Sequence, residues 1–235
     1  MFENVIGQAA ADRLRDDLEA GIKAPSMLFF GPAASGKGTT ALELGRVLSC
    51  EGTSPRTGSR TGPLVGAWNC PCSGCARHRL LLHPDLLMMG QRAFAGEIAA
   101  SAAVLLRDPR HGRLLLLRAA RKLLGRFSPV LWEDSTGLGK LNSHIQALED
   151  DLEGLGALDL DGTGSNAAVE KLGASIMKNA LKLEDEGIGE TIPVAQIRRA
   201  SYWGRLAPVG RQKLLLIEGA DRMREEALNS LLKIL

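Results

Sequence analysis

The sequence has no apolar run of the ~18 residues that a membrane-spanning helix needs, and its N-terminus lacks a basic segment followed by an apolar one. Its formal net charge is only +2, so composition alone makes no case for a nucleic-acid or membrane partner. Cysteine is absent outside residues 50–75. Because 45% of the residues are apolar, we expect the chain to fold. Because no membrane-spanning run and no leader pattern is found, we expect a cytoplasmic protein with no membrane partner.

All four cysteines lie in one window: Cys50, Cys70, Cys72 and Cys75. In a cytosolic protein such a cluster favours a metal over disulfides. Four thiolates can close a tetrahedral Zn²⁺ site and fold a loop that has no core of its own. We predict a structural zinc module at 50–78, with reduced, unligated thiols as the alternative. Only one residue separates Cys70 from Cys72, which makes Cys70 the ligand most open to replacement by His78.

Short apolar runs alternate with helical periodicity at both ends of the chain. Strands are predicted at 26–30, 85–89 and 213–217, and helices at 9–20, 37–50, 193–206 and 223–235. This alternation predicts an α/β fold in which a parallel sheet is flanked by helices. Residues 90–189 are helical and charge-blocked in pattern, and are interpreted as a large helical insert.

Residues 31–37 fit the phosphate-loop pattern G-x-x-x-x-G-K, between a predicted strand and a predicted helix. Backbone N–H groups and the lysine can converge there on nucleotide phosphates. The candidate ATP-binding residues are Gly31, Ala34, Ser35, Gly36, Lys37, Gly38 and Thr39. Gly38 stands where a hydroxyl normally binds Mg²⁺, and the Gly-Lys-Gly-Thr run also occurs in nucleotide kinases, so a small kinase is an alternative.

A second nucleotide motif is expected at the end of the strand 213–217. Glu218 takes the position of the metal-binding acid, and Gly219 takes that of the acid that activates water. Glycine cannot polarise water, so no catalytic residue is assigned. The pattern predicts a site that binds ATP and Mg²⁺ without efficient hydrolysis.

Several segments together resemble the AAA+ subunits of bacterial DNA polymerase III clamp loaders, the delta prime branch above all. The segments that carry the resemblance are Phe2–Gln8, Leu28–Lys37, His83–Asp85, Ile192–Arg198, Gly210–Lys213, Ala220–Met223 and Ala227–Lys233. The family also has a zinc module after the helix that follows its phosphate loop. Gamma and tau subunits of the family would be expected to keep an intact hydrolytic site, which Gly219 does not provide.

The resemblance implies a P-loop AAA+ sheet at 1–89 and 190–235, interrupted by the zinc module and the insert. It implies a role in DNA replication, in which the subunit joins delta and gamma or tau subunits to load the sliding clamp onto primed DNA. Family members continue past this sequence into a lid and a collar, so we expect the sequence to be a fragment.

The insert itself has two notable patterns. A leucine-rich stretch is surrounded by basic residues at 107–126, which fits either contact with DNA phosphates or, as we favour, a leucine face packed on the domain. Residues 159–164 with Glu170 partly match a calcium loop, and a glycine-rich turn between helices is favoured there. Together with the predicted zinc module, the basic stretch at 107–126 leaves a zinc-stabilised DNA-binding module as a further alternative to a clamp-loader subunit and a nucleotide kinase.

Overall fold

The computed structural model describes residues 1–52, 66–132, 138–160 and 165–233. Most of these residues are helical, and the sheet that they contain has two strands. The chain divides into two compact units, 1–87 with 204–216 and 232–235, and 88–203 with 217–231. The partial match to a calcium loop at 159–164 falls largely outside the described residues.

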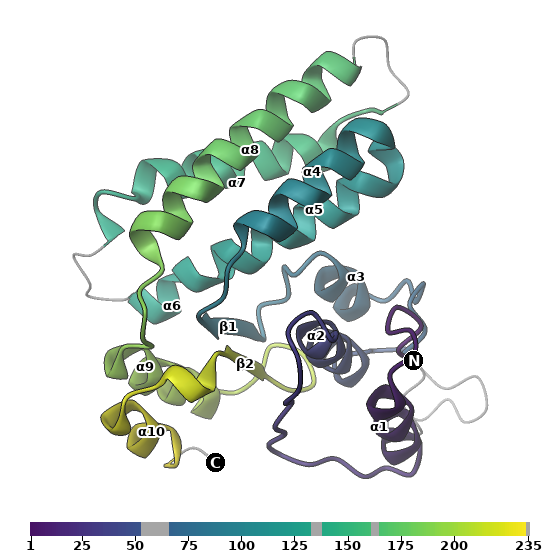
Figure 1. The fold of residues 1–235 in the computed structure, drawn as a ribbon. Coiled ribbons are helices and arrows are strands. Elements are labelled where there is room, and N and C mark those ends of the chain that lie inside the picture. Colours follow the sequence, from purple (N-terminus) through teal and green to yellow (C-terminus); the bar gives the residue numbers. More distant parts are fainter. Residues whose placement is uncertain (53–65, 133–137, 161–164, 234–235) are drawn as a thin grey trace. The chain divides into compact units, whose positions relative to one another are not determined.

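The first unit is organised around helix α2 (Lys37–Leu48), shown with its neighbours in Figure 1. Every residue of α2 from Thr40 to Leu48 is buried. Helix α1 (Ala9–Glu19) packs on it through a cluster of apolar side chains: Phe2, Ala11, Leu18, Leu44, Val47 and Leu48. The short helix α3 (Ser73–Arg79) packs on α2 as well. The predicted helices at 9–20 and 37–50 are thereby confirmed.

Strands β1 (Leu86–Gly90) and β2 (Leu214–Glu218) form the sheet. Leu214 N–H donates to the carbonyl of Asp85 at the start of the pair, and Gln91 N–H donates to that of Glu218 at its end. The strands therefore run parallel, and both predicted strands, 85–89 and 213–217, are confirmed within one residue.

The predicted AAA+ fold class is wrong, because the described residues are mostly helical and contain one sheet of two strands, not a larger parallel sheet flanked by helices. Residues 26–30 have no strand pairing, and the side chains of Leu28 and Phe30 are 82% and 88% exposed. Phe29 alone of this run packs against the cluster on α2. A continuous apolar run was taken for a strand buried on both faces, but only one of its large side chains reaches a core.

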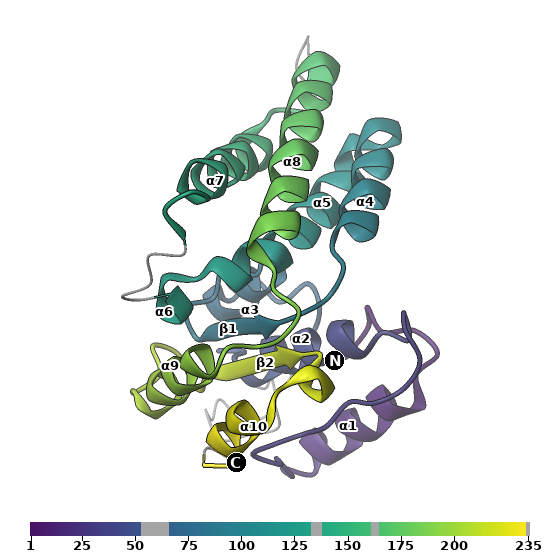
Figure 2. The same ribbon diagram turned by 60° about the vertical axis from the view of Figure 1, so that its left-hand side comes forward.

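The second unit contains a bundle of four helices, α4 (Ala95–Arg107), α5 (Pro109–Leu124), α7 (Asn142–Ala157) and α8 (Ser165–Gly187). Figures 1 and 2 both show α4 and α5 side by side, with α8 running along them. Three leucines of α5, Leu116, Leu117 and Leu123, are buried in the bundle core, whereas Leu115 is 47% exposed. This arrangement matches the packed leucine face that was favoured over a DNA-contacting one.

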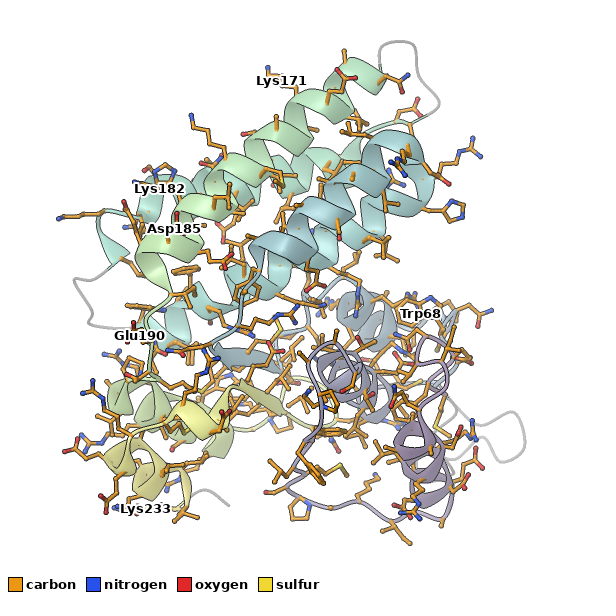
Figure 3. All side chains as sticks on the ribbon, in the orientation of Figure 1. Trp68, Lys171, Lys182, Asp185, Glu190 and Lys233 are labelled. Atoms are coloured by element: carbon orange, nitrogen blue, oxygen red, sulfur yellow. The ribbon has the colours of Figure 1, made fainter. Side chains whose placement is uncertain are left out.

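Shorter elements complete the second unit. They are η1 (Gly125–Phe127), α6 (Pro129–Trp132), α9 (Val194–Arg205), η3 (Ala220–Arg222) and α10 (Glu225–Leu231). Glu184 on α8 accepts the N–H groups of Phe94 and Ala95, which ties α8 to the first turn of α4. Figure 3 places Lys171, Lys182 and Asp185 along α8, where Lys182 forms an ion pair with Glu186.

Candidate metal centre

Four cysteine sulfurs converge just beyond the C-terminal end of α2. The Sγ atoms of Cys50, Cys70, Cys72 and Cys75 all lie within 4.8 Å of one another, and none is in a disulfide. The Sγ of Cys50 is 3.7 Å from that of Cys70 and 4.0 Å from that of Cys72. Four sulfurs bound to one Zn²⁺ at about 2.3 Å would lie about 3.8 Å apart, so the cluster fits a single tetrahedral metal ion.

The backbone at the start of α3 presents N–H groups to one of these sulfurs. Cys72 is the N-cap of α3, and its Sγ accepts the N–H of Cys75 and the N–H of Glu51, each at 3.4 Å. Backbone donors of this kind orient a cysteine sulfur that serves as a metal ligand. The Cys72-Ser73-Gly74-Cys75 segment therefore places two ligands on one short helix and supports one of them with two donors.

Glycine at position 74 permits the close approach of α3 to the end of α2. A Cβ atom at Gly74 would lie 2.4 Å from the carbonyl oxygen of Ser49, a backbone atom that cannot turn away. A Cβ at Gly52 would lie 3.4 Å from the Cys50 sulfur and 3.5 Å from the Cys70 sulfur, which is ordinary van der Waals contact, so that position does not require glycine. The absence of a side chain at Gly74 therefore lets α3 bring Cys72 and Cys75 close to Cys50.

A buried ion pair lies on α2 beside the cluster. Arg46 and Glu43 are 1% and 0% exposed at their side chains, and the guanidinium donates to both carboxylate oxygens of Glu43. Arg46 also donates to the Sγ of Cys75 at 3.2 Å. Burial alone would lower the pKa of Arg46, but the hydrogen bond and charge of Glu43 outweigh it, and the pKa lies above its ordinary value.

The segment that carries Cys70 into the cluster is held by two arginines. Arg46 donates to the carbonyls of Gly66 and Ala67, at 2.6 Å and 2.8 Å. Arg79 on α3 donates to the carbonyls of Trp68 and Cys70, at 2.6 Å and 2.7 Å. Figure 3 labels Trp68. The Cζ atom of Arg46 lies over the Trp68 ring, 5.6 Å from the ring centroid. These contacts bring Cys70 to its partners despite the long gap after Cys50.

The pKa values of three of the cysteine thiols depart from their ordinary values, and not all in the same direction. A hydrogen bond from the Cys75 thiol lowers the pKa of Cys50 to about 5, against the opposing effect of burial. Burial raises the pKa of Cys70, and the hydrogen bond with Cys50 raises that of Cys75. These shifts favour a thiolate at Cys50 over one at Cys70 or Cys75, and a metal ion bound by the sulfurs would favour the thiolate form of its ligands.

His78 does not belong to the group of sulfur ligands. Its Nε2 atom lies 2.9 Å from the Ser49 hydroxyl, and its ring stacks on that of His83 with centroids 4.3 Å apart. From the sequence, His78 was an alternative to Cys70 as the fourth ligand. In the structure the Cys70 sulfur lies with the other three sulfurs, and His78 is not part of the group.

The predicted phosphate loop leads directly into α2. Gly36 is the N-cap of α2 with φ of 82°, and Gly31 and Ala34 also have positive φ. The Lys37 ammonium donates to the carbonyls of Gly31 and Pro32, at 2.8 Å and 2.6 Å. The loop therefore folds around its own lysine at the head of a helix, but no strand precedes it.

Three of the other predicted nucleotide-binding residues, Ser35, Gly38 and Thr39, are half-buried in this loop and the first turn of α2. Glu218, the predicted metal-binding acid, lies in the second unit. Its carboxylate is paired with Arg126 and Arg92, so its oxygens are engaged by guanidinium groups. The geometry supports a four-cysteine metal site and gives no corresponding support for a Mg²⁺–ATP site.

Sequence reasoning missed Arg46, Glu43 and Gly74 as parts of the site. The pairing of Glu43 with Arg46 three residues later is a common pattern on exposed helix faces, and only burial of the whole helix gives it another meaning. Gly74, within the pattern Cys-Ser-Gly-Cys, was the one signal available, because a glycine between ligands indicates a close approach of backbone.

Among the described residues, no helix is both long enough and apolar enough to cross a bilayer. Comparison with known proteins adds no family: no family model, no curated protein and no solved structure matches the chain.

Proposed function

We propose that the cysteine cluster holds a structural Zn²⁺ and that the chain is a clamp-loader subunit of the delta prime type. In this role the protein contributes to assembly of the loader and binds nucleotide weakly, without efficient hydrolysis. The four-thiolate donor set favours Zn²⁺ over Mg²⁺ or Ca²⁺, which prefer oxygen ligands.

The observation that carries the subunit assignment is the contact made by Asp85. Its two carboxylate oxygens accept the N–H groups of Val209 and Gly210, at 3.0 Å and 2.6 Å, and Asp85 is fully buried. The His83-Pro84-Asp85 segment and the Gly210–Lys213 segment both belong to the resemblance with clamp-loader subunits. Although the insert separates them in sequence, this buried carboxylate fastens one to the other.

The absence of a catalytic acid supports assembly over catalysis. Gly219 stands where water would be activated, with φ of 67°, and the preceding Glu218 is committed to two arginines. The loop at Gly31–Lys37 keeps the glycines and the lysine that hold phosphate, but it lacks a strand to position it. A subunit of this kind would contribute surfaces to a complex while its neighbours supply the hydrolysis.

The test is to mix the protein with the other bacterial clamp-loader subunits and the sliding clamp, and to separate the complexes by size-exclusion chromatography. The proposal predicts that the protein co-elutes with delta and gamma or tau subunits. The Asp85→Ala variant should lose this association, whereas Asp221→Asn, a change at an exposed residue, should keep it. Absence of any complex with the wild-type protein would overturn the assignment.

Activity measurements on the same protein distinguish the alternatives. An active ATPase or a nucleotide kinase would turn over ATP, or phosphorylate nucleoside monophosphates, at rates near 1 per second or above. A zinc-stabilised DNA-binding module would bind DNA without other subunits, with affinity falling steeply as salt rises. The proposal predicts negligible turnover and no strong DNA binding by the isolated chain.

A further inference from the structure

Arg46 uses every hydrogen-bond donor that it has. A guanidinium carries five N–H groups in a fixed planar fork. Two of them reach Glu43, two reach the carbonyls of Gly66 and Ala67, and the fifth reaches the Sγ of Cys75. Because the plane is rigid, these contacts fix one another, and the donor to the sulfur cannot swing away without breaking the other four.

The hydrogen bond from Arg46 to Cys75 acts on a sulfur of the metal site, unlike an ordinary ion pair on a helix. Four thiolates around Zn²⁺ leave a net negative charge on the cluster, which a buried site must offset with donors or cations. The Cys75 Sγ lies 3.2 Å from Nη1 of Arg46, and both side chains are shielded from water. A charged donor at a buried sulfur draws electron density from that ligand and stabilises its anionic form.

We propose that Arg46 is a positioning residue of the metal centre, a role that rests on the proposed zinc site. It donates to the Cys75 thiolate and, through Gly66 and Ala67, holds the segment that delivers Cys70. Glu43 orients the guanidinium for both tasks. In this way the Arg46 side chain supports two of the four ligands, Cys75 and Cys70. Cys70 is the ligand that the sequence spacing made most open to replacement.

The simpler view is that Arg46 and Glu43 form only a structural ion pair within the core. That view predicts that Arg46 changes alter stability but leave the electronic state of the sulfurs as it is. Cobalt can distinguish the two, since Co²⁺ occupies tetrahedral sulfur sites and its sulfur-to-metal charge-transfer bands report electron donation by each thiolate.

The experiment compares wild type with Arg46→Met, Arg46→Lys and Leu42→Ala after loading with Co²⁺ and, separately, with Zn²⁺. Leu42 is buried on the same helix and its side chain has no donor, so its truncation is a matched control for packing loss. Measured quantities are the charge-transfer spectrum, the Zn²⁺ affinity by competition with a chelator, and thermal stability.

The proposal predicts that Arg46→Met shifts the charge-transfer band to lower energy and weakens Zn²⁺ binding by about 10- to 100-fold. Arg46→Lys, which keeps the charge but not the fork, should fall between it and wild type. Leu42→Ala should lose stability with the spectrum unchanged. If Arg46→Met does not fold, a shifted spectrum and weaker binding in Arg46→Lys carry the same conclusion.

A wild-type spectrum and affinity in the Arg46 variants, or an equal shift in Leu42→Ala, would overturn the positioning role while leaving the zinc site in place. Failure of the wild-type protein to bind either metal would instead overturn the zinc site itself, and with it the role of Arg46. The two failures are therefore distinguishable in the same experiment.

Discussion

Replacing Glu218 by Gln tests whether this carboxylate is a structural partner of arginines or a ligand for Mg²⁺. In the structure its oxygens pair with Arg126 and Arg92, and the Arg126 side chain is only 3% exposed. Burial lowers the pKa of Arg126 to about 10, and the charge of Glu218 opposes that fall. Without this carboxylate, a buried guanidinium loses its principal counter-charge.

The expected cost follows from the burial of the pair. Removing one partner of a fully buried ion pair costs about 3–5 kcal/mol, because the remaining charge is left without compensation. Glu218 is itself 19% exposed, and Arg126 keeps its bond to the carbonyl of Gly90, so the cost is reduced to about 2–4 kcal/mol. For a chain of this size, a loss of that order lowers the melting temperature by roughly 4–16 °C.

Thermal unfolding followed by circular dichroism, without Mg²⁺ or nucleotide, is the assay. Asp221→Asn serves as the control, because Asp221 is exposed and lies three residues away. The double variant Glu218→Gln with Arg126→Met should recover part of the loss, since the orphaned charge is gone. If Glu218→Gln has the melting temperature of the wild-type protein but loses Mg²⁺-dependent ATP binding, the assignment of Glu218 as a structural partner of the arginines is refuted.

Three further outcomes are expected. Gly74→Ala places a Cβ 2.4 Å from the Ser49 carbonyl and should weaken Zn²⁺ binding about 10-fold or more by chelator competition; wild-type affinity would contradict the packing described. Burial lowers the pKa of His83 from 6.5, so the unfolded chain binds more protons, and stability should fall as pH drops below 6.5. Denaturant titrations at pH 7.5 and 5.5 measure this fall, which His83→Asn should reduce; an identical fall in that variant would exclude His83 as its source. Gly90→Ala places a Cβ 2.0 Å from the Glu218 carbonyl oxygen at a residue whose φ is +96°. It should lower the free energy of unfolding in urea by about 2–4 kcal/mol. An unchanged urea midpoint would show that β1 and β2 can move apart to make room for the methyl group.

Helices with long periodic patterns could be predicted from the sequence. Short apolar runs could not all be assigned correctly as strands. The period of α1 and α2 determines which faces are apolar, and both helices are where the sequence placed them. Residues 85–89 and 213–217 pair as strands, but 26–30, which has the same pattern of one polar residue followed by four apolar ones, does not. A run of four apolar residues predicts burial but does not show which part of the molecule would cover it, and Phe30 is 88% exposed.

The candidate site was predictable to the extent that it depends on residue type alone. Four cysteines in one window indicated a metal site, and their sulfurs do gather. The supporting shell was not predictable, because Arg46 and Gly66 are twenty residues apart and meet only through the fold. The arginine partners of Glu218 were not predictable for the same reason, since Arg92 and Arg126 lie in distant parts of the sequence.

The metal content of the purified protein tests the central claim most directly. Elemental analysis of protein prepared without added chelator, combined with titration of accessible thiols before and after chelator, should give one zinc per chain and four thiols that react only after zinc is removed. Cys72→Ser should lose that zinc. Protein without metal, whose four thiols react at once and which takes up no Zn²⁺ on titration, would contradict the account.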